Sequence, residues 1–307
     1  MQHYSKLIKV FFGTILLAVV TAFTLVSIRP AKAPANKLAC CHSNQSDAAY
    51  TAIEEFADLT HDQAFVASHE MPTDLNTYPP KGKMVEFATT DGKKSKAYVN
   101  RASGKSPHYL LVIHEWWGLN KNVKKEADQL FKDLKKQGVN VVALDLYDGK
   151  VATTRKDAGK YMRNTQTARA EAIIKGALAM ANKATDNKAK IGTIGWCFGG
   201  GWSLQASILA GKQAAACVMY YGMPEKNVER LKLLKTDVLG IFAKKDRWIT
   251  PKIVKTFETQ MKSIDKSVRI YQYDAAHAFA NPSSPRYEKK AAKDAYKKAL
   301  KFLKKRM

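Results

Sequence analysis

The sequence of 307 residues predicts an α/β fold, built on a mostly parallel sheet with helices on both faces. Short apolar runs rich in Val, Ile and Leu alternate with segments in which apolar residues recur every three or four positions. The apolar runs are continuous rather than alternating, which is typical of parallel strands buried on both faces. A hydrophobic share of 46% and an aromatic share of 10% suit a packed globular core.

The predicted elements begin with a hairpin, because strand-like runs at 83–90 and 96–101 flank Asp91-Gly92, a common turn sequence. Continuous apolar runs then predict strands at 109–114, 139–145, 190–194, 214–221, 237–243 and 267–273. Helical spacing of apolar residues predicts helices at 48–59, 123–134, 168–183, 202–210, 251–264 and 289–306. The alternation of the two kinds of segment predicts one folded domain over residues 81–307.

The N-terminal residues 1–35 have a different character. An uncharged apolar run at 10–28 follows Lys6 and Lys9, and it is long enough to cross a hydrocarbon core of ~30 Å. We expect an N-terminal hydrophobic helix here, either a signal peptide or an uncleaved membrane anchor. Basic residues flank both ends of the run, so its orientation stays open. We expect export to the periplasmic or extracellular side, with a cytoplasm-facing anchor as the alternative.

Residues 36–80 are predicted to be a polar lead-in or linker, because they are irregular outside 48–59 and end in Tyr78-Pro79-Pro80. The formal net charge of +24 is compatible with binding to nucleic acid or to anionic lipid. Since no known nucleic-acid-binding pattern accompanies the charge, we interpret it as solvated surface and expect no nucleic-acid partner.

Cys197 lies between a predicted strand and a predicted helix, in the sequence Gly-Trp-Cys-Phe-Gly-Gly-Gly at 195–201. A glycine-flanked residue at such a junction is held on a sharp turn at the carboxyl edge of the sheet, as in a nucleophile elbow. The next backbone N–H, that of Phe198, then points toward the place where an oxyanion would form. The pattern predicts that Cys197 is a nucleophile.

Asp246, His277 and Glu115 also follow predicted strands directly. In parallel sheets, chemistry collects in the loops beyond the carboxyl ends of the strands. The order nucleophile, acid, histidine along the chain is that of an α/β-hydrolase. The imidazole would take the thiol proton, and the carboxylate of Asp246 would orient the ring. The alternatives are that His277 closes a loop and that Asp246 caps the helix near Pro251.

With these residues in place, the sequence resembles the dienelactone hydrolase family over roughly residues 83–303. The resemblance rests on His114-Glu115-Trp116-Trp117-Gly118, Ala143-Leu144-Asp145-Leu146-Tyr147, the elbow sequence around Cys197, and His277-Ala278-Phe279. The family triad falls on Cys197, Asp246 and His277. The resemblance implies that Glu115 accepts the thiol proton when substrate arrives, unless it serves only as a helix cap. It also implies an oxyanion hole made by the backbone N–H groups of Phe198 and Trp116.

Aromatic side chains near the strand ends are candidates for the wall of a substrate site. We expect Trp117, Trp196, Tyr147 and Asn281 to contact substrate, although Trp116, Trp117 and Trp196 are equally suited to packing the loops. Family members that cleave dienelactone hold its carboxylate with two arginines, and the matching positions here are Asn281 and Gly149. We therefore do not expect dienelactone itself as the substrate, although Arg155 or Arg163 could supply a cation from another direction.

The sequence as a whole predicts a hydrolase that cleaves a small ester or lactone through an acyl-cysteine intermediate. No cofactor is expected, since the glycines of the elbow surround a thiol instead of opening a phosphate-binding loop. No metal is expected either, because the seven histidines show no paired ligand spacing beside suitable carboxylates, apart from the weak neighbours His69-Glu70 and His114-Glu115. The alternatives are a non-catalytic binding module of the same fold, a thiol redox sensor, and a protein that binds anionic lipid or nucleic acid through its charge.

Overall fold

The computed structural model describes residues 47–70 and 78–307, which form one compact unit. The predicted N-terminal hydrophobic helix within residues 1–35 lies outside the described residues. Among the residues that the structure does describe, no helix combines the length and the apolar character needed to cross a membrane.

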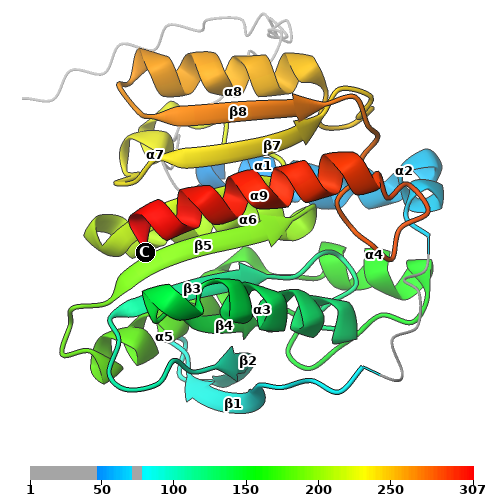
Figure 1. Ribbon diagram of the computed structural model, residues 1–307. Helices are drawn as coiled ribbons and strands as arrows, with labels where there is room; N and C mark the ends of the chain where they lie inside the picture. The colour runs from blue at the N-terminus through cyan, green and yellow to red at the C-terminus, as the bar shows by residue number, and fades with distance from the viewer. Residues whose placement is uncertain (1–46, 71–77) are drawn as a thin grey trace, which may run out of the picture. The chain divides into compact units, whose positions relative to one another are not determined.

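One sheet of eight strands runs through the unit, in the order β1-β2-β4-β3-β5-β6-β7-β8 (Figure 1). The first two strands pair antiparallel to their neighbours, and β4, β3, β5, β6, β7 and β8 are all parallel. The strands are β1 (Lys83–Ala88), β2 (Lys94–Asn100), β3 (His108–Ile113), β4 (Asn140–Leu144), β5 (Lys190–Trp196), β6 (Ala214–Tyr220), β7 (Val238–Ala243) and β8 (Val268–Tyr273).

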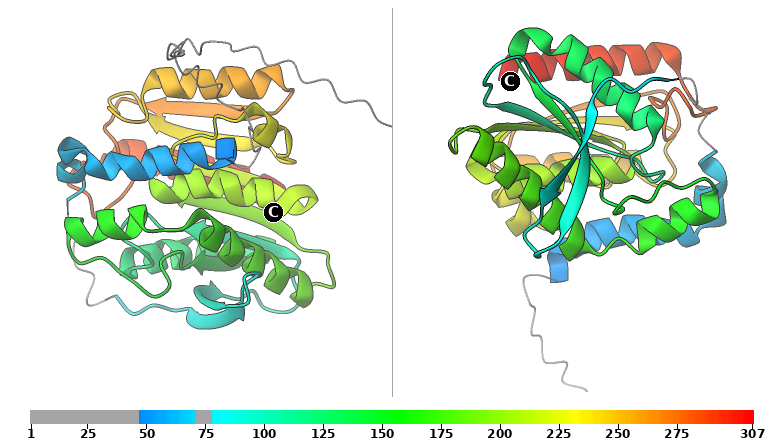
Figure 2. Two further views of the ribbon diagram at one scale, coloured as in Figure 1. Left: turned by 180° about the vertical axis from the view of Figure 1, so that it is seen from behind. Right: turned by 90° about the horizontal axis from the view of Figure 1, so that it is seen from below.

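Helices cover both faces of the sheet, as the two further views show (Figure 2). On one face lie α3 (Lys121–Asp133) and α9 (Lys289–Arg306), and on the other lie α1 (Asp47–Asp58), α4 (Arg155–Arg163), α5 (Thr167–Ala184) and α6 (Phe198–Ala210). The remaining helices are α2 (Gln63–Ser68), α7 (Val228–Lys232), α8 (Pro251–Ser263) and the short 3-10 helices η1 (Leu59–His61), η2 (Lys135–Gln137) and η3 (Gly211–Gln213).

The predicted α/β class and the predicted strands are confirmed, because the continuous apolar runs are the buried centre of the sheet. Every residue of β4 and of β7 is buried, and in β3 and β5 only the first residue is not. The hairpin is present as well, since Ala88 pairs with Lys94 across a turn in which Gly92 adopts φ +79°. Three short helices, α2, α4 and α7, were not predicted from the sequence.

The lead-in packs against the domain that holds the sheet instead of running free of it. Phe56 of α1 and Phe65 of α2 are buried, and α1 packs on α6. The side chain of Arg163 donates to Thr60 Oγ1 at 2.7 Å, and Arg155 Nε donates to the carbonyl oxygen of His69 at 2.8 Å. Both arginines therefore hold the lead-in, which corrects the idea that either one offers a free cation to a substrate.

Candidate active site

The sharp turn predicted around Cys197 is present between β5 and α6. Cys197 adopts φ 55° and ψ −121°, a backbone strain that typically costs about 1–3 kcal/mol and persists where the surroundings enforce it. The surrounding glycines allow the close approach of three backbone segments. A Cβ on Gly195 would lie 2.0 Å from the carbonyl oxygen of Gly199, and one on Gly199 would lie 2.3 Å from that of Ile113.

Asp246 and His277 form a buried pair at the carboxyl ends of β7 and β8. His277 Nδ1 lies 2.6 Å from Asp246 Oδ2, while Asp246 Oδ1 accepts the backbone N–H groups of Trp248 and Ile249, each at 3.0 Å. Helix α8 is capped by Thr250, so Asp246 does not have the capping role considered as its alternative. The carboxylate fixes the ring so that His277 Nε2 is left for other partners.

The charges of this pair stabilise each other. Burial alone would lower the pKa of His277, but the carboxylate of Asp246 outweighs it and raises that pKa to about 10. Burial alone would raise the pKa of Asp246, but the charge of His277 and the hydrogen bonds to the carboxylate hold it below its usual value. At neutral pH the resting pair is therefore imidazolium and carboxylate.

The thiol of Cys197 lies against two imidazole rings. Its Sγ is 3.7 Å from His69 Nε2, and one donor atom from each of Cys197, His69 and His277 lies within 4.8 Å of the others. Burial raises the pKa of the thiol, while His277 and the Phe198 backbone N–H act against that rise. The structure thus places Cys197, His277, Asp246 and His69 close to one another.

From the sequence, His69 was noted only as a weak neighbour of Glu70, and its contact with Cys197 was not predicted. Its Nδ1 lies 2.8 Å from the carbonyl oxygen of Phe65, so this nitrogen carries the proton and Nε2 is an acceptor. Burial lowers the pKa of His69 to about 3, and the ring is neutral. His69 is 128 residues away from Cys197 in the chain, and only the packing of α2 brings them together.

The lead-in also closes the site. The ring of Phe65 contacts Trp116, Trp248 and His277 with centroids 6.0, 5.2 and 6.3 Å apart. Trp248 Nε1 donates to Asp62 Oδ2 at 2.9 Å, which ties the lead-in to the loop after β7. Cys197 and His277 are each only 1% exposed. A substrate reaches the thiol only if some of these covering side chains move.

Glu115, in the loop directly after β3, is partly buried among neutral partners. Asn281 Nδ2 donates to its Oε2 at 2.5 Å, and the hydroxyl of Tyr221 lies 3.4 Å from its Oε1. Burial raises the pKa of Glu115 to about 7, although the charge of His277 and these two bonds act to lower it. Asn281, predicted as a substrate contact, thus holds a carboxylate of the protein. The helix that follows is capped by Asn120, so Glu115 is not its cap.

The raised pKa of Glu115 predicts a pH-dependent contribution to stability. Between pH 4.5 and about 7 the folded protein keeps a proton on Glu115 that the unfolded chain releases. This contribution to the free energy of unfolding is about 3 kcal/mol. It is complete below pH 4.5 and is lost as pH rises through about 7. We expect Glu115→Gln to remove it, measured as the difference between the two proteins in denaturant unfolding at several pH values. If the difference in unfolding free energy between the two proteins did not change with pH, the argument that burial raises the pKa of Glu115 would be wrong.

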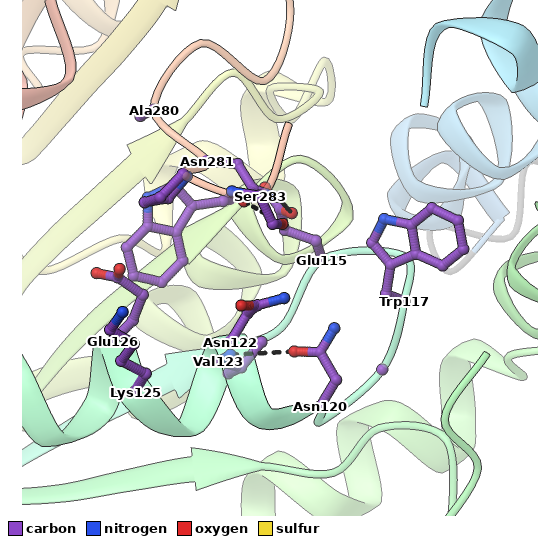
Figure 3. A pocket seen from close by; sticks show the side chains of 13 residues that line it. Glu115, Trp117, Asn120, Asn122, Val123, Lys125, Glu126, Ala280, Asn281 and Ser283 are labelled. Atoms are coloured by element: carbon purple, nitrogen blue, oxygen red, sulfur yellow. Dashed lines mark hydrogen bonds between the residues drawn. The ribbon is translucent and has the colours of Figure 1, made fainter. Parts of the chain in front are cut away.

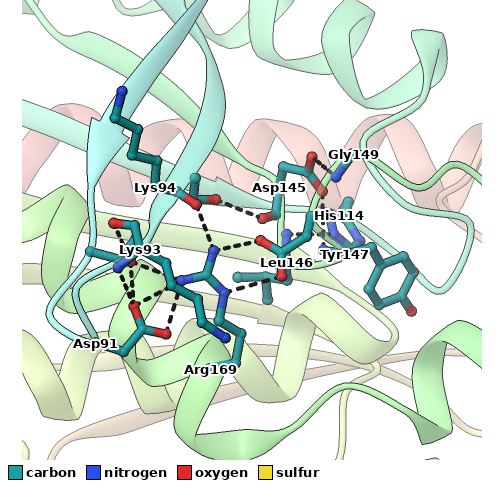
Figure 4. Close-up of polar contacts among 12 residues, drawn as sticks. Asp91, Lys93, Lys94, His114, Asp145, Leu146, Tyr147, Gly149 and Arg169 are labelled. Carbon is teal, nitrogen blue, oxygen red and sulfur yellow. Dashed lines mark hydrogen bonds and ion pairs between the residues drawn. The ribbon is translucent and has the colours of Figure 1, made fainter.

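Polar contacts fix the loops that carry the site (Figure 4). His114 is neutral because burial lowers its pKa; its Nδ1 lies 2.6 Å from the carbonyl oxygen of Glu115, and its Nε2 accepts from the backbone N–H of Leu146. Asp145 Oδ2 accepts the N–H of Gly149 at 2.6 Å, with Gly149 at φ +90°. Gly149, where the resemblance places an arginine, is therefore a turn residue of this loop.

The other predicted oxyanion and substrate residues lie in the same region. Trp116 is buried beside His69, with ring centroids 4.4 Å apart, and Phe198 begins α6 directly after the nucleophile. Tyr147 is buried against His114 and Phe198, with centroids 4.6 and 5.6 Å apart, and does not line the cavity described next. Tyr147 therefore packs against these loop residues, and its contact with substrate stays a prediction.

A cavity of about 170 Å³ lies at the start of α3, with Glu115 in its wall (Figure 3). Its walls include two predicted substrate residues, Trp117 and Trp196, and two carboxyl groups, Glu115 and Glu126. Burial raises the pKa of Glu126 to about 7 as well. The remaining lining residues are Gly118, Asn120, Asn122, Val123, Lys125, Ala280, Asn281, Pro282 and Ser283. No arginine is among them, so the cavity is poorly suited to a carboxylate.

The profile of the dienelactone hydrolase family matches residues 96–307, which is more than half of the chain and holds Cys197, Asp246, His277 and Glu115. The chain belongs to the dienelactone hydrolase family. It is a hydrolase, as are the members of this family, which act on ester and lactone bonds. The part of the lead-in that covers the thiol lies before the matched residues.

Among curated relatives, Protein usf of Aquifex pyrophilus is 28% identical over 233 residues, covering 73% of this chain and 98% of its own. Carboxymethylenebutenolidase 1 of Cupriavidus pinatubonensis is 22% identical over 229 residues, covering 71% of this chain and 95% of its own. The crystal structure of a dienelactone hydrolase-like promiscuous phosphotriesterase from metagenomic libraries matches with a TM-score of 0.60 and 19% identity, covering 73% of this chain and 98% of the other. The similarity to this crystal structure shows that the two proteins share a fold.

Proposed function

We propose that this hydrolase cleaves a small neutral ester or lactone through an acyl-cysteine intermediate, with Cys197 as nucleophile, His277 as proton carrier and Asp246 as the group that orients His277. The observation that carries the proposal is the buried Asp246–His277 pair beside a thiol held on a strained elbow. Strain of this kind collects at functional sites, where the surroundings hold it in place.

The pKa directions at the site favour a second base. Burial raises the pKa of the Cys197 thiol, and the carboxylate of Asp246, together with the sulfur of Cys197, raises the pKa of His277, so His277 is a weak acceptor for the thiol proton. Glu115 lies near enough that its charge raises the pKa of the thiol, and with a pKa of about 7 it is partly ionised at neutral pH. In the proposed mechanism Glu115 takes the thiol proton, and the resulting thiolate pairs with the imidazolium.

The reaction then proceeds in two balanced steps. The thiolate attacks the carbonyl carbon, and the negative charge that forms on oxygen is stabilised by the backbone N–H groups of Phe198 and Trp116. The C–O bond breaks as the imidazolium of His277 gives its proton to the leaving alkoxide, leaving an acyl-cysteine. His277, now neutral, takes a proton from water as the oxygen attacks the acyl carbon. The C–S bond then breaks, the carboxylic acid leaves, and the Cys197 thiolate takes back the proton held by Glu115, which restores the imidazolium, the thiol and the Glu115 carboxylate.

The charges around the cavity beside Glu115 favour a neutral group at that place. Two carboxyl groups, Glu115 and Glu126, face one cation, Lys125, and no arginine lines its walls, whereas a separate pocket beside His277 is lined by Lys245, Arg247 and Arg286. The two sequence positions where the resemblance places carboxylate-binding arginines are held by Asn281 and Gly149, and both are engaged with the protein itself. A cavity of about 170 Å³ admits a small acyl or alkyl group more readily than a long chain.

Trapping the intermediate tests this function directly. We expect p-nitrophenyl acetate and small lactones to give a burst of product and, after acid quench, a protein one acyl group heavier, with the added group on the peptide that contains Cys197. Rapid-quench mass spectrometry of the full chain measures both. Hydrolysis at an unchanged rate with no acyl group on that peptide would show that the chemistry runs through another residue. The absence of hydrolysis across the whole panel would favour the non-catalytic binding module.

A further inference from the structure

His69, Cys197 and His277 form a compact set of nitrogen and sulfur donors. One donor atom from each lies within 4.8 Å of the others, and all three residues are buried. The distance between Cys197 Sγ and His69 Nε2 is 3.7 Å. With Zn–S of ~2.3 Å and Zn–N of ~2.0–2.1 Å, tetrahedral geometry places a sulfur and a nitrogen ligand roughly 3.5 Å apart. The observed spacing is close to that of two ligands of one ion.

Both imidazole rings are held as metal-binding histidines usually are. A ligating histidine nearly always gives its second ring N–H to a carboxylate or to a backbone carbonyl, which fixes the ring and its tautomer. His69 Nδ1 lies 2.8 Å from the carbonyl oxygen of Phe65, and His277 Nδ1 lies 2.6 Å from Asp246 Oδ2. Both Nε2 atoms are thereby left for the centre of the group.

His277 Nε2 supplies an independent observation. It is buried and makes no hydrogen bond of normal geometry among the described residues, although the Cys197 thiol lies close enough to act on its pKa, and His277 as a whole is 1% exposed. A buried polar atom without a partner costs free energy, which a ligand at that position would recover. Two imidazoles and a thiolate are the donor types that suit Zn²⁺, whereas Mg²⁺ and Ca²⁺ prefer oxygen.

We propose that His69, Cys197 and His277 bind one thiophilic divalent cation, for which Zn²⁺ is the probe, and that this binding takes the thiol out of reaction. A bond forms between the metal and Sγ, and the thiol proton and the proton on His277 Nε2 pass to solvent. Two Nε2–metal bonds complete three protein ligands, and water fills the fourth position. Metal binding stands independently of the proposed ester hydrolysis. Only its consequence, a reversible inhibition, rests on that function.

The proposed metal site depends on the lead-in, because the lead-in supplies His69 as one of the three ligands. It belongs to the segment that closes over the elbow and lies before residues 96–307, the part that matches the family. Its neutral ring adds the third ligand to a thiol and an imidazole that the proposed reaction already uses. Because the three donors are buried, we expect the ion to enter and leave slowly, when α2 lifts from the site.

The test uses the full chain with Cys40 and Cys41 replaced by Ser, so that these adjacent thiols do not bind the metal. We expect Co²⁺ added to the metal-free protein to give the strong near-ultraviolet absorption of a cobalt–thiolate bond, which one equivalent of Zn²⁺ removes. His69→Ala should bind more than roughly 100-fold more weakly, because the loss of a supporting partner alone costs 10–100-fold. His61→Ala is the matched control, as an exposed histidine of the same lead-in. It should bind as the parent does.

A second measurement follows the reactivity of the Cys197 thiol toward an alkylating reagent. Saturating Zn²⁺ should slow alkylation of Cys197 by iodoacetamide at least tenfold in the parent and in His61→Ala, but not in His69→Ala, measured on the Cys197 peptide. A parent without the cobalt–thiolate band, or a band that His69→Ala leaves unchanged, would overturn the site. If the metal-free protein hydrolyses no ester while the band is present, the proposed hydrolysis fails and the metal site stands. Equal hydrolysis with and without Zn²⁺ would overturn the inhibition.

Discussion

Cys197→Ala should lower kcat/KM for any ester that the protein hydrolyses by at least about 10⁴-fold, because loss of a nucleophile removes the covalent path and leaves only binding and oxyanion stabilisation. The substitution removes the sulfur that lies 3.7 Å from His69 Nε2 and beside His277, but it leaves the Asp246–His277 pair in place. Folding should be largely retained, which circular dichroism and denaturant unfolding would check. Steady-state hydrolysis of the best ester of the panel measures the loss.

Cys217→Ala is the matched control for this variant. Cys217 is the other free cysteine among the described residues; it is buried in β6, and its Sγ lies 3.9 Å from the hydroxyl of Ser203. We expect its replacement to leave kcat/KM within about twofold and to cost about 1 kcal/mol of stability through the small cavity it leaves. A Cys197→Ala protein that keeps more than a tenth of the parent activity would rule out the acyl-cysteine mechanism.

Much of the fold and the chemistry of the site could be read from the sequence, because both depend on local patterns. Strands such as β4 and β7 are buried on both faces, so they appear as continuous apolar runs. The elbow has its own signature, since only glycine permits the approach of Gly195 to the backbone of Gly199. Residues at the carboxyl ends of parallel strands gather at one edge, which places Asp246 near His277.

The part that could not be read depends on packing between distant segments. The lead-in looked polar and irregular, and α2 has only six residues, too few for a clear helical period. Nothing near His69 in the sequence indicates that its ring reaches the thiol of Cys197. Arg155 and Arg163 were interpreted as cations open to a substrate, but their partners, His69 and Thr60, lie about 90 to 100 residues away. Long-range partners of this kind leave no spacing for a sequence pattern to show.

Gly199→Ala should have a large effect on stability, with an expected loss of about 3 kcal/mol or more in the free energy of unfolding. The new Cβ would lie 2.3 Å from the carbonyl oxygen of Ile113 and 2.5 Å from that of His114, distances that real Cβ atoms do not show. These backbone atoms cannot rotate away, so either the elbow or the end of β3 must shift. The gain in helix propensity from alanine, about 1 kcal/mol, is too small to offset that strain.

Gly201→Ala is the control for Gly199→Ala, because it makes the same change two residues further along the same helix. It tests whether the loss of stability in Gly199→Ala comes from the close contact between the new Cβ and the backbone at the end of β3. Its Cβ would lie 3.1 Å from the carbonyl oxygen of Met223 and 3.3 Å from Ile53 Cδ1, so shifts of a few tenths of an ångström would relieve it. We expect a stability change within about 1 kcal/mol, because helix propensity and mild crowding nearly cancel.

In Gly199→Ala the displaced end of β3 carries Glu115 and Trp116, so the folded fraction should also lose activity, by ~10²–10³ if one oxyanion donor moves away. Equal losses in the two variants would mean that the contact with β3 does not hold the elbow.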